Sequence, residues 1–147
     1  HDREGQRTLL YNELSKNKKI FFPFLFKNNI NKIGNSSCDK INFISNSIYN
    51  ICPENSKFEN YYTEKIFQSL EAGCIPLYWA IDLPEQKILN NNCYCFIDLE
   101  KDNIEEKIKY LVNNKEKYII DNIFNDSAKS EIENMYNSLI NEIKKFI

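Results

Sequence analysis

Apolar positions recur along the chain at two spacings, which indicate helices and strands in alternation. Apolar residues three or four positions apart form one face of a helix, whereas a short continuous apolar run is typical of a strand buried on both faces. The first pattern predicts helices over residues 3–15, 39–46, 63–72, 84–89, 103–112, 115–124 and 127–146. The second predicts strands over residues 20–26, 48–52, 74–79 and 93–97. This order is typical of an α/β domain with a mainly parallel sheet.

Residues 48–79 have the pattern of a complete strand–helix–strand unit, whose two strands run parallel. The buried stripe of its helix consists of Ile66, Phe67 and Leu70. Thr63 is expected to cap this helix at its start, and Gly73 follows its last turn, where a left-handed residue is favoured. Ligands of such sheets bind beyond the carboxyl ends of the strands. The connection from the first strand to the helix is therefore the candidate binding segment.

Length and composition describe one ordinary globular domain. The chain has 147 residues, of which 42% are hydrophobic and 14% aromatic, enough for a real core. Its 19 Lys and Arg against 21 Asp and Glu give a formal net charge of -2, so we expect no nucleic-acid partner. The longest apolar run, residues 74–81, is far shorter than the roughly 20 residues that cross a bilayer.

The cysteines and the single histidine argue against a metal site. The five cysteines form an odd set, and most lie in apolar runs, where a free thiol behaves as a small hydrophobic residue. Cys93 and Cys95 are expected to share one face of a strand, but no second pair stands at zinc spacing. His1 is the only histidine and stands at the chain end. We therefore expect no metal, reduced thiols and a cytoplasmic location.

The connection within residues 48–79 is dense in side chains that form hydrogen bonds. These residues include Glu54, Asn55, Ser56, Tyr61, Tyr62, Thr63, Glu64 and Lys65. The sequence has neither a G-x-G-x-x-G nor a G-x-x-x-x-G-K-[ST] pattern and only three glycines, which excludes a glycine-lined phosphate loop. A nucleotide must then be held by side chains and a helix N-terminus, where Lys65 can reach a phosphate. A solvated surface lysine is the alternative interpretation of Lys65.

Three short segments of this unit together resemble a known family. Residues 50–56 contain an E-N-[ST] element, residues 61–66 a Y-x-T-E-K element and residues 72–79 an A-G-x-x-P strand. In this order and spacing they resemble the donor-binding signature of the α-1,3-fucosyltransferases. Arg7 lies in a helical pattern that is similar to the arginine-bearing helix upstream of that signature.

The resemblance implies an inverting GT-B-type glycosyltransferase that transfers fucose from GDP-fucose to a glycan acceptor. The chain then corresponds to its C-terminal, Rossmann-like half, a single donor-binding domain over residues 1–147. Arg7 and Lys65 are implied to bind the phosphates. Contacts to the nucleotide and sugar are implied for Asn55, Tyr61 and Glu64. No metal or other cofactor is implied, because the two cations stabilise the charge of the leaving GDP.

The resemblance also implies that part of the enzyme lies outside this chain. The sequence begins with His1 rather than Met and opens on a helix pattern, so we expect an upstream segment to be missing. The family's general base, a glutamate, belongs to the N-terminal acceptor domain, so no catalytic residue is expected here. The chain is then expected to bind donor without efficient transfer by itself, and the missing domain would select the glycan acceptor.

Two other functions stay open, a non-catalytic module that binds a nucleotide sugar and a transferase that uses a different nucleotide sugar. The joint presence of Arg7, Glu64 and Lys65 favours the enzyme, because a module has no need of all three. The amphipathic helix over residues 127–146 is expected to pack on the sheet or the missing domain in preference to lipid. The expected location is cytoplasmic with peripheral contact to the inner membrane, or the Golgi in a eukaryote.

Overall fold

A parallel sheet of three strands lies at the centre of the structure. The computed structural model describes residues 5–16, 18–23, 27, 29–56, 58, 61, 63–81 and 87–146. In sheet order, the strands are β1 (Tyr49–Ile51), β2 (Ile75–Tyr78) and β3 (Cys95–Phe96). β1 pairs with β2 and β2 with β3, both in parallel. The predicted α/β class with its parallel sheet is confirmed, and each of these strands lies inside its predicted range.

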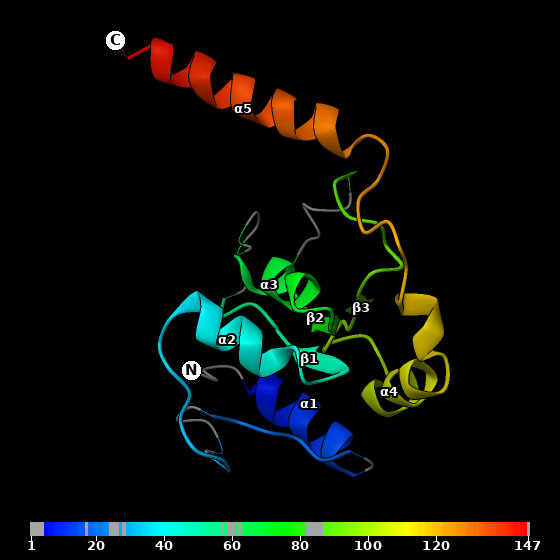
Figure 1. Cartoon of the computed structure of the whole chain (residues 1–147). Coiled ribbons are helices and arrows are strands. Elements are labelled where there is room, and N and C mark those ends of the chain that lie inside the picture. Colours follow the sequence, from blue (N-terminus) through cyan, green and yellow to red (C-terminus); the bar gives the residue numbers. More distant parts are fainter. Residues whose placement is uncertain are drawn as a thin grey trace.

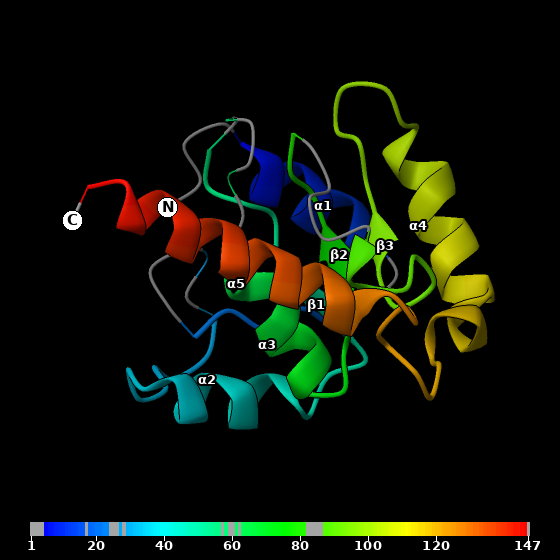
Figure 2. The same cartoon turned by 90° about the horizontal axis from the view of Figure 1, so that it is seen from above.

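Helices cover both faces of the sheet (Figures 1 and 2). α1 (Gln6–Ser15) and α4 (Ile104–Asn113) pack on one face, and α3 (Lys65–Glu71) packs on the other. Side chains of β2 alternate accordingly: Leu77 packs with α1 and α4, whereas Tyr78 packs with α3. Because β2 is buried on both faces, its sequence is a continuous apolar run.

α2 (Ser37–Ile44) packs against α3 and begins two residues before its predicted start, at a capping box. The Ser36 hydroxyl accepts a hydrogen bond from the N–H of Asp39, and the Asp39 carboxylate accepts one from the N–H of Ser36. A Cβ at Gly34 would overlap a carboxylate oxygen of Asp39. A side chain at position 34 would therefore displace the carboxylate that caps this helix.

α3 begins later than predicted because Thr63 does not cap it. Glu64 occupies the N-cap position and makes no side-chain cap hydrogen bond. The Thr63 hydroxyl instead donates to the carboxylate of Glu54 at 2.9 Å. At the other end, Gly73 has a φ of 74°, so its predicted left-handed conformation is confirmed.

The predicted strand over residues 20–26 is absent from residues 20–23, and residues 24–26 lie outside the described part. The side chain of Asn29 takes the place of a neighbouring strand. Its oxygen accepts from the N–H of Phe22 at 2.7 Å, and its amide donates to the carbonyl of Ile20 at 2.6 Å. Backbone groups that are satisfied by a side chain need no sheet partner. The strand prediction is therefore wrong for these residues.

The predicted helix over residues 115–124 is wrong beyond its first turn. Only η2 (Lys115–Tyr118), a 3-10 turn, is helical, and Phe124 forms an isolated antiparallel bridge with Leu89. Backbone hydrogen bonds beside this bridge keep the segment extended, among them the 2.9 Å bond from the N–H of Asn125 to the carbonyl of Ile88. Of the predicted helix over residues 84–89, residues 84–86 lie outside the described residues, and Leu89 at its end forms the bridge with Phe124 instead of a helical turn.

Cys93 and Cys95 pack on opposite faces of the sheet, so their predicted shared face is wrong. Cys95 belongs to the cluster under α1 and α4, whereas Cys93 belongs to the cluster under α3. β3 starts only at Cys95, so strand alternation does not extend back to Cys93. All five cysteines are free thiols, and all except Cys38 are buried.

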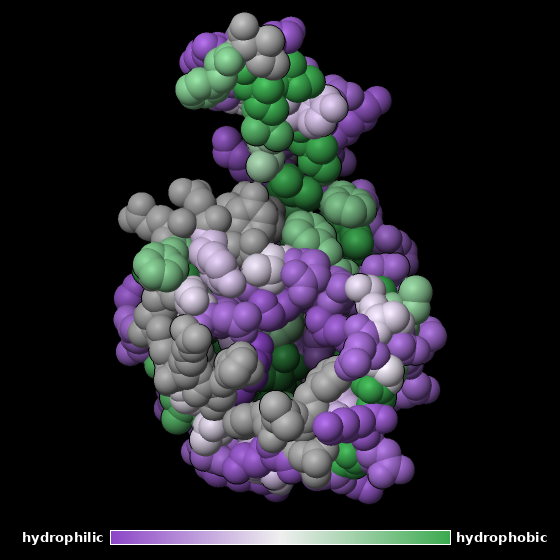
Figure 3. Space-filling model, turned by 90° about the vertical axis from the view of Figure 1, so that its left-hand side faces the viewer, coloured by the Kyte–Doolittle hydropathy of each residue, from purple (hydrophilic) through white to green (hydrophobic). Residues whose placement is uncertain are grey.

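α5 (Ala128–Lys144) is the predicted C-terminal helix, but it stands apart from the sheet (Figure 1). Figure 3 shows hydrophobic surface along this helix. Its large exposed apolar residues are Ile132, Met135, Tyr136, Leu139 and Ile143. The expected packing on the sheet is therefore not found. None of the helices in the described ranges has the length and hydropathy needed to cross a membrane.

Candidate functional site

Backbone hydrogen bonds continue the pairing of β1 with β2 beyond the strands and into the candidate segment. The N–H of Cys52 donates to the carbonyl of Leu77 at 3.0 Å, and the N–H of Glu54 donates to that of Trp79 at 2.9 Å. Glu54 is 1% exposed. It therefore lies buried at the carboxyl ends of both strands, the edge of an α/β sheet where ligands bind.

The carboxylate of Glu54 is the centre of a hydrogen-bond network. It accepts hydrogen bonds from the N–H and the hydroxyl of Thr63, at 2.8 and 2.9 Å. It accepts another from the ammonium of Lys65 at 2.8 Å and a longer one from the Tyr78 hydroxyl at 3.4 Å. A buried carboxylate needs a cation and several donors to offset its desolvation. The network thus ties the end of β1 to β2 and to the first turn of α3.

The Glu54 network also holds Lys65, which the family resemblance implies to bind phosphate. Its ammonium donates to the Glu54 carboxylate and to the Thr63 hydroxyl, each at 2.8 Å, and its side chain is 13% exposed. Lys65 is therefore not a solvated surface lysine. An ammonium has three N–H bonds. Two of them have partners among the described residues, which leaves the third for a ligand.

Arg7 and Asn55 lie together although 48 positions separate them in the sequence. The Arg7 guanidinium donates a hydrogen bond of 3.1 Å to the side-chain oxygen of Asn55. Asn55 directly follows Glu54, so this contact brings α1 to the loop after β1. Two of the predicted site residues, Arg7 and Asn55, are thereby joined. They lie next to Glu54, whose carboxylate binds the ammonium of Lys65.

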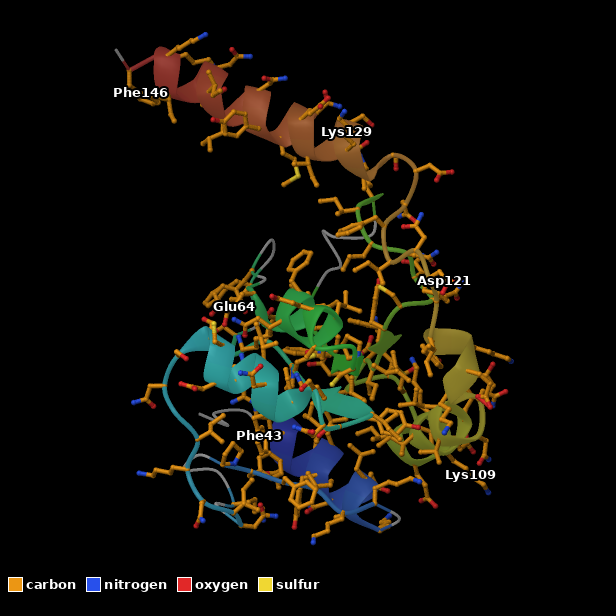
Figure 4. The ribbon with its side chains drawn as sticks, viewed as in Figure 1. Phe43, Glu64, Lys109, Asp121, Lys129 and Phe146 are labelled. Carbon is orange, nitrogen blue, oxygen red and sulfur yellow. The ribbon has the colours of Figure 1, made fainter. Side chains whose placement is uncertain are left out.

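Glu64 and Tyr61 are the two remaining residues that the resemblance implies for the site. Glu64 is exposed at the N-cap position of α3, near the first turn of α2 (Figure 4). Tyr61 is half-buried, and its N–H donates to the carbonyl of Phe58 at 3.1 Å. In the described part of the chain, no side-chain hydrogen bond joins Tyr61 to the other predicted site residues. Glu64 is therefore free of a capping role and accessible to a ligand.

A pocket of about 240 Å³ opens beside Glu64, between α2 and α3. Its lining consists of Gly34, Asn35, Ser36, Ser37, Lys40, Glu64 and Gln68. Lys40 is half-buried and donates a hydrogen bond to the side-chain oxygen of Gln68. Burial lowers the pKa of Lys40, Glu64 opposes this shift, and Lys65 and Arg7 add to it. Lys40 therefore lies within electrostatic reach of three of the predicted site residues.

Two residues of this region, Glu54 and Lys40, are not among the site residues predicted from the sequence. Glu54 was recognised only as one of the polar residues in the connection. Its signal was an acidic residue two positions after the predicted strand over residues 48–52, at the sheet edge where ligands bind. Lys40 lies outside the three matched segments, and its sequence position in a short helix contains no signal of the pocket.

The site consists of charged and amide side chains suited to an anion with attached hydroxyl groups. Arg7 and Lys65 supply positive charge, and Glu64 supplies an acceptor for hydroxyl protons. Burial raises the pKa of the neighbouring Cys52 thiol to about 12, so this thiol is protonated at neutral pH and is a poor nucleophile. In the ranges that the structure describes, no cluster of three or more His, Cys, Asp or Glu residues is arranged to hold a metal ion.

Comparison with known proteins finds similarity to solved structures. No family model and no curated protein matches the chain. A crystal structure of an α1,3-fucosyltransferase with GDP matches with a TM-score of 0.61 and 26% identity, over 76% of this chain and 32% of that chain. A second crystal structure of an α1,3-fucosyltransferase matches with a TM-score of 0.60 and 26% identity, over 76% of this chain and 31% of that chain. A third, with GDP-fucose, has a TM-score of 0.59 and 24% identity, over 76% and 32%.

The chain thus spans about a third of the length of the proteins that it matches. The two folds are alike in the α/β class with its parallel sheet. The sequences are also similar, with 26% of the residues identical. The fold is that of a fragment of a glycosyltransferase. Together with the three matched segments, this likeness confirms the resemblance read from the sequence: the chain is similar to α1,3-fucosyltransferases in fold and in these segments.

Proposed function

We propose that this chain is the donor-binding domain of an inverting fucosyltransferase, which takes fucose from GDP-fucose and passes it to a glycan acceptor. The observation that carries the proposal is the Glu54 network, which holds the ammonium of Lys65 at the carboxyl ends of β1 and β2. The Arg7–Asn55 contact supports it from the adjoining loop. The similar structures that contain GDP and GDP-fucose support the choice of donor.

In this proposal the two cations act on the leaving diphosphate. The acceptor oxygen forms a bond to the anomeric carbon of fucose while the bond from that carbon to the diphosphate oxygen breaks. The electron pair of the broken bond goes to GDP, whose growing negative charge is stabilised by Arg7 and Lys65. The proton of the acceptor hydroxyl goes to a general base, which the family resemblance assigns to an acceptor domain.

Glu54 contributes by fixing the geometry of Lys65 before the donor binds. Lysine side chains have several rotatable bonds, and ordering one on binding has an entropic cost. Two hydrogen bonds already hold the Lys65 ammonium, so much of this cost is met on folding. A preorganised cation also needs little rearrangement as charge develops on the leaving group.

Calorimetric titration of this chain with GDP, GDP-fucose and UDP, with a chelator present, tests the proposal. We expect GDP and GDP-fucose to bind at least about tenfold more tightly than UDP, because the resemblance and the similar structures with GDP and GDP-fucose favour a guanosine donor. Absence of GDP binding by the folded chain would contradict the proposal. Equal affinity for GDP and UDP would instead favour a transferase that uses a different nucleotide sugar.

A further inference from the structure

Most of the residues that line the pocket between α2 and α3 lie outside the three matched sequence segments. Of its lining residues, only Glu64 and Gln68 lie on or beside α3, whereas residues 34–37 and Lys40 come from the turn before α2 and from α2 itself. Glu64 is followed directly by Lys65, so the pocket adjoins the proposed phosphate position. A group that occupies the pocket can therefore be part of the same ligand.

The lining has the chemistry of a site for a neutral group that both donates and accepts hydrogen bonds. It contains one cation, Lys40, and one carboxylate, Glu64, so it has no excess charge to attract a phosphate. The other polar groups are hydroxyls and amides. A hydroxyl group can donate to a carboxylate and accept from an ammonium. Two adjacent hydroxyls on one ring therefore match Glu64 and Lys40 together.

The pocket's size limits what it can hold. Its volume of about 240 Å³ lies below the roughly 300–1,000 Å³ of sites that enclose whole drug-sized ligands. A single ring is thus a better match than a complete nucleotide. The Asp39–Ser36 capping box and the close approach of Gly34 to Asp39 fix the wall formed by residues 34–37. Gln68 holds the Lys40 side chain from the α3 side.

We propose that this pocket binds a sugar ring through vicinal hydroxyls, with Lys40 donating to one hydroxyl and Glu64 accepting from its neighbour. The inference rests on the proposed function, because it places this ring in the same nucleotide sugar whose diphosphate contacts Lys65. The ring has two sources in such a ligand, the ribose of the nucleotide and the transferred fucose. Lys40 is then a binding residue that the three matched segments do not include.

The test compares Lys40→Met with the unchanged chain in titrations with GDP, 2′,3′-dideoxy-GDP and GDP-fucose. Lys109→Met is the control, because Lys109 is an exposed lysine on α4, well apart from Glu64 in Figure 4. If the ribose occupies the pocket, Lys40→Met weakens GDP binding about tenfold and leaves dideoxy-GDP unaffected, since a hydrogen bond from a charged donor is lost. If fucose occupies it, only the affinity for GDP-fucose falls, by a similar factor.

Two results would overturn the inference while leaving the proposed function intact. One is an unchanged affinity of Lys40→Met for both GDP and GDP-fucose. The other is an equal loss for all three ligands, which would make Lys40 a further contact of the diphosphate. Absence of GDP binding by the unchanged chain would instead remove the proposed function and this inference together. Thermal unfolding verifies that each variant is folded. If Lys40→Met does not fold, Lys40→Gln replaces it, because glutamine retains a hydrogen-bond donor for Gln68.

Discussion

Replacing Glu54 with alanine is expected to lower the free energy of unfolding by about 3–5 kcal/mol, because removal of one partner leaves a buried charge uncompensated. The side chains of Glu54 and Lys65 are 0% and 13% exposed, so water cannot easily replace the lost partner. The N–H and hydroxyl of Thr63 lose their acceptor as well. The effect is therefore larger than that of an exposed ion pair.

Urea unfolding followed by circular dichroism measures this change. Glu64→Ala is the matched control, because Glu64 is also a glutamate beside α3 but is exposed and caps nothing. We expect Glu64→Ala to alter the free energy of unfolding by no more than about 0.5 kcal/mol. Similar losses for the two variants would mean that the Glu54 network does not stabilise the fold as described.

The double variant Glu54→Gln/Lys65→Met is expected to recover most of this stability while losing donor binding. A neutral glutamine can still accept from Thr63, and the buried charge pair is removed as a whole, which is often neutral for stability. The proposed phosphate contact of Lys65 is lost in the double variant. We expect the affinity for GDP to fall by about 10- to 100-fold, the range for a lost hydrogen bond to a charged group.

This variant separates the structural from the binding role of the network. Titration with GDP measures the affinity, and urea unfolding of the same sample measures the stability. Lys109→Met again serves as the control, with both quantities unchanged. If the double variant bound GDP as tightly as the unchanged chain, Lys65 would be only a partner of Glu54 and no part of a donor site.

The sequence was sufficient to predict the elements whose partners are close in the chain. β1, α3 and β2 form one continuous unit, and the apolar run of β2 follows from its burial on both faces. α4 was predicted because its caps and its buried residues belong to one short segment. Within the candidate site, the matched segments pointed to Asn55, Glu64 and Lys65, which the structure places around the start of α3 and the loop before it.

Elements that depend on a distant or unusual partner could not be predicted in this way. Residues 20–23 have the composition of a strand, but the side chain of Asn29 satisfies their backbone. Residues beyond Tyr118 have a helical pattern, but Phe124 pairs with Leu89 instead. In both cases a tertiary partner overrides the local preference.

The Glu54 network at the centre of the candidate site could not be predicted from the sequence for the same reason. The partners of Glu54 come from the connection, from α3 and from β2, and no spacing rule brings Thr63, Lys65 and Tyr78 to one carboxylate. The pocket beside Lys40 likewise depends on how α2 packs against α3. Charged residues at such sites are recognised only when burial and hydrogen bonds are known together.

The central claim is that the Glu54 network and the start of α3 form the binding site for the diphosphate of a nucleotide sugar. Backbone NMR of the 15N-labelled chain during titration with GDP tests it most directly. We predict that the largest shift changes occur at the amides of residues 54–56 and 64–66, and that those of α4 stay unchanged. Saturable GDP binding that leaves residues 54–56 and 64–66 unaffected, or that perturbs mainly α4, would contradict the claim.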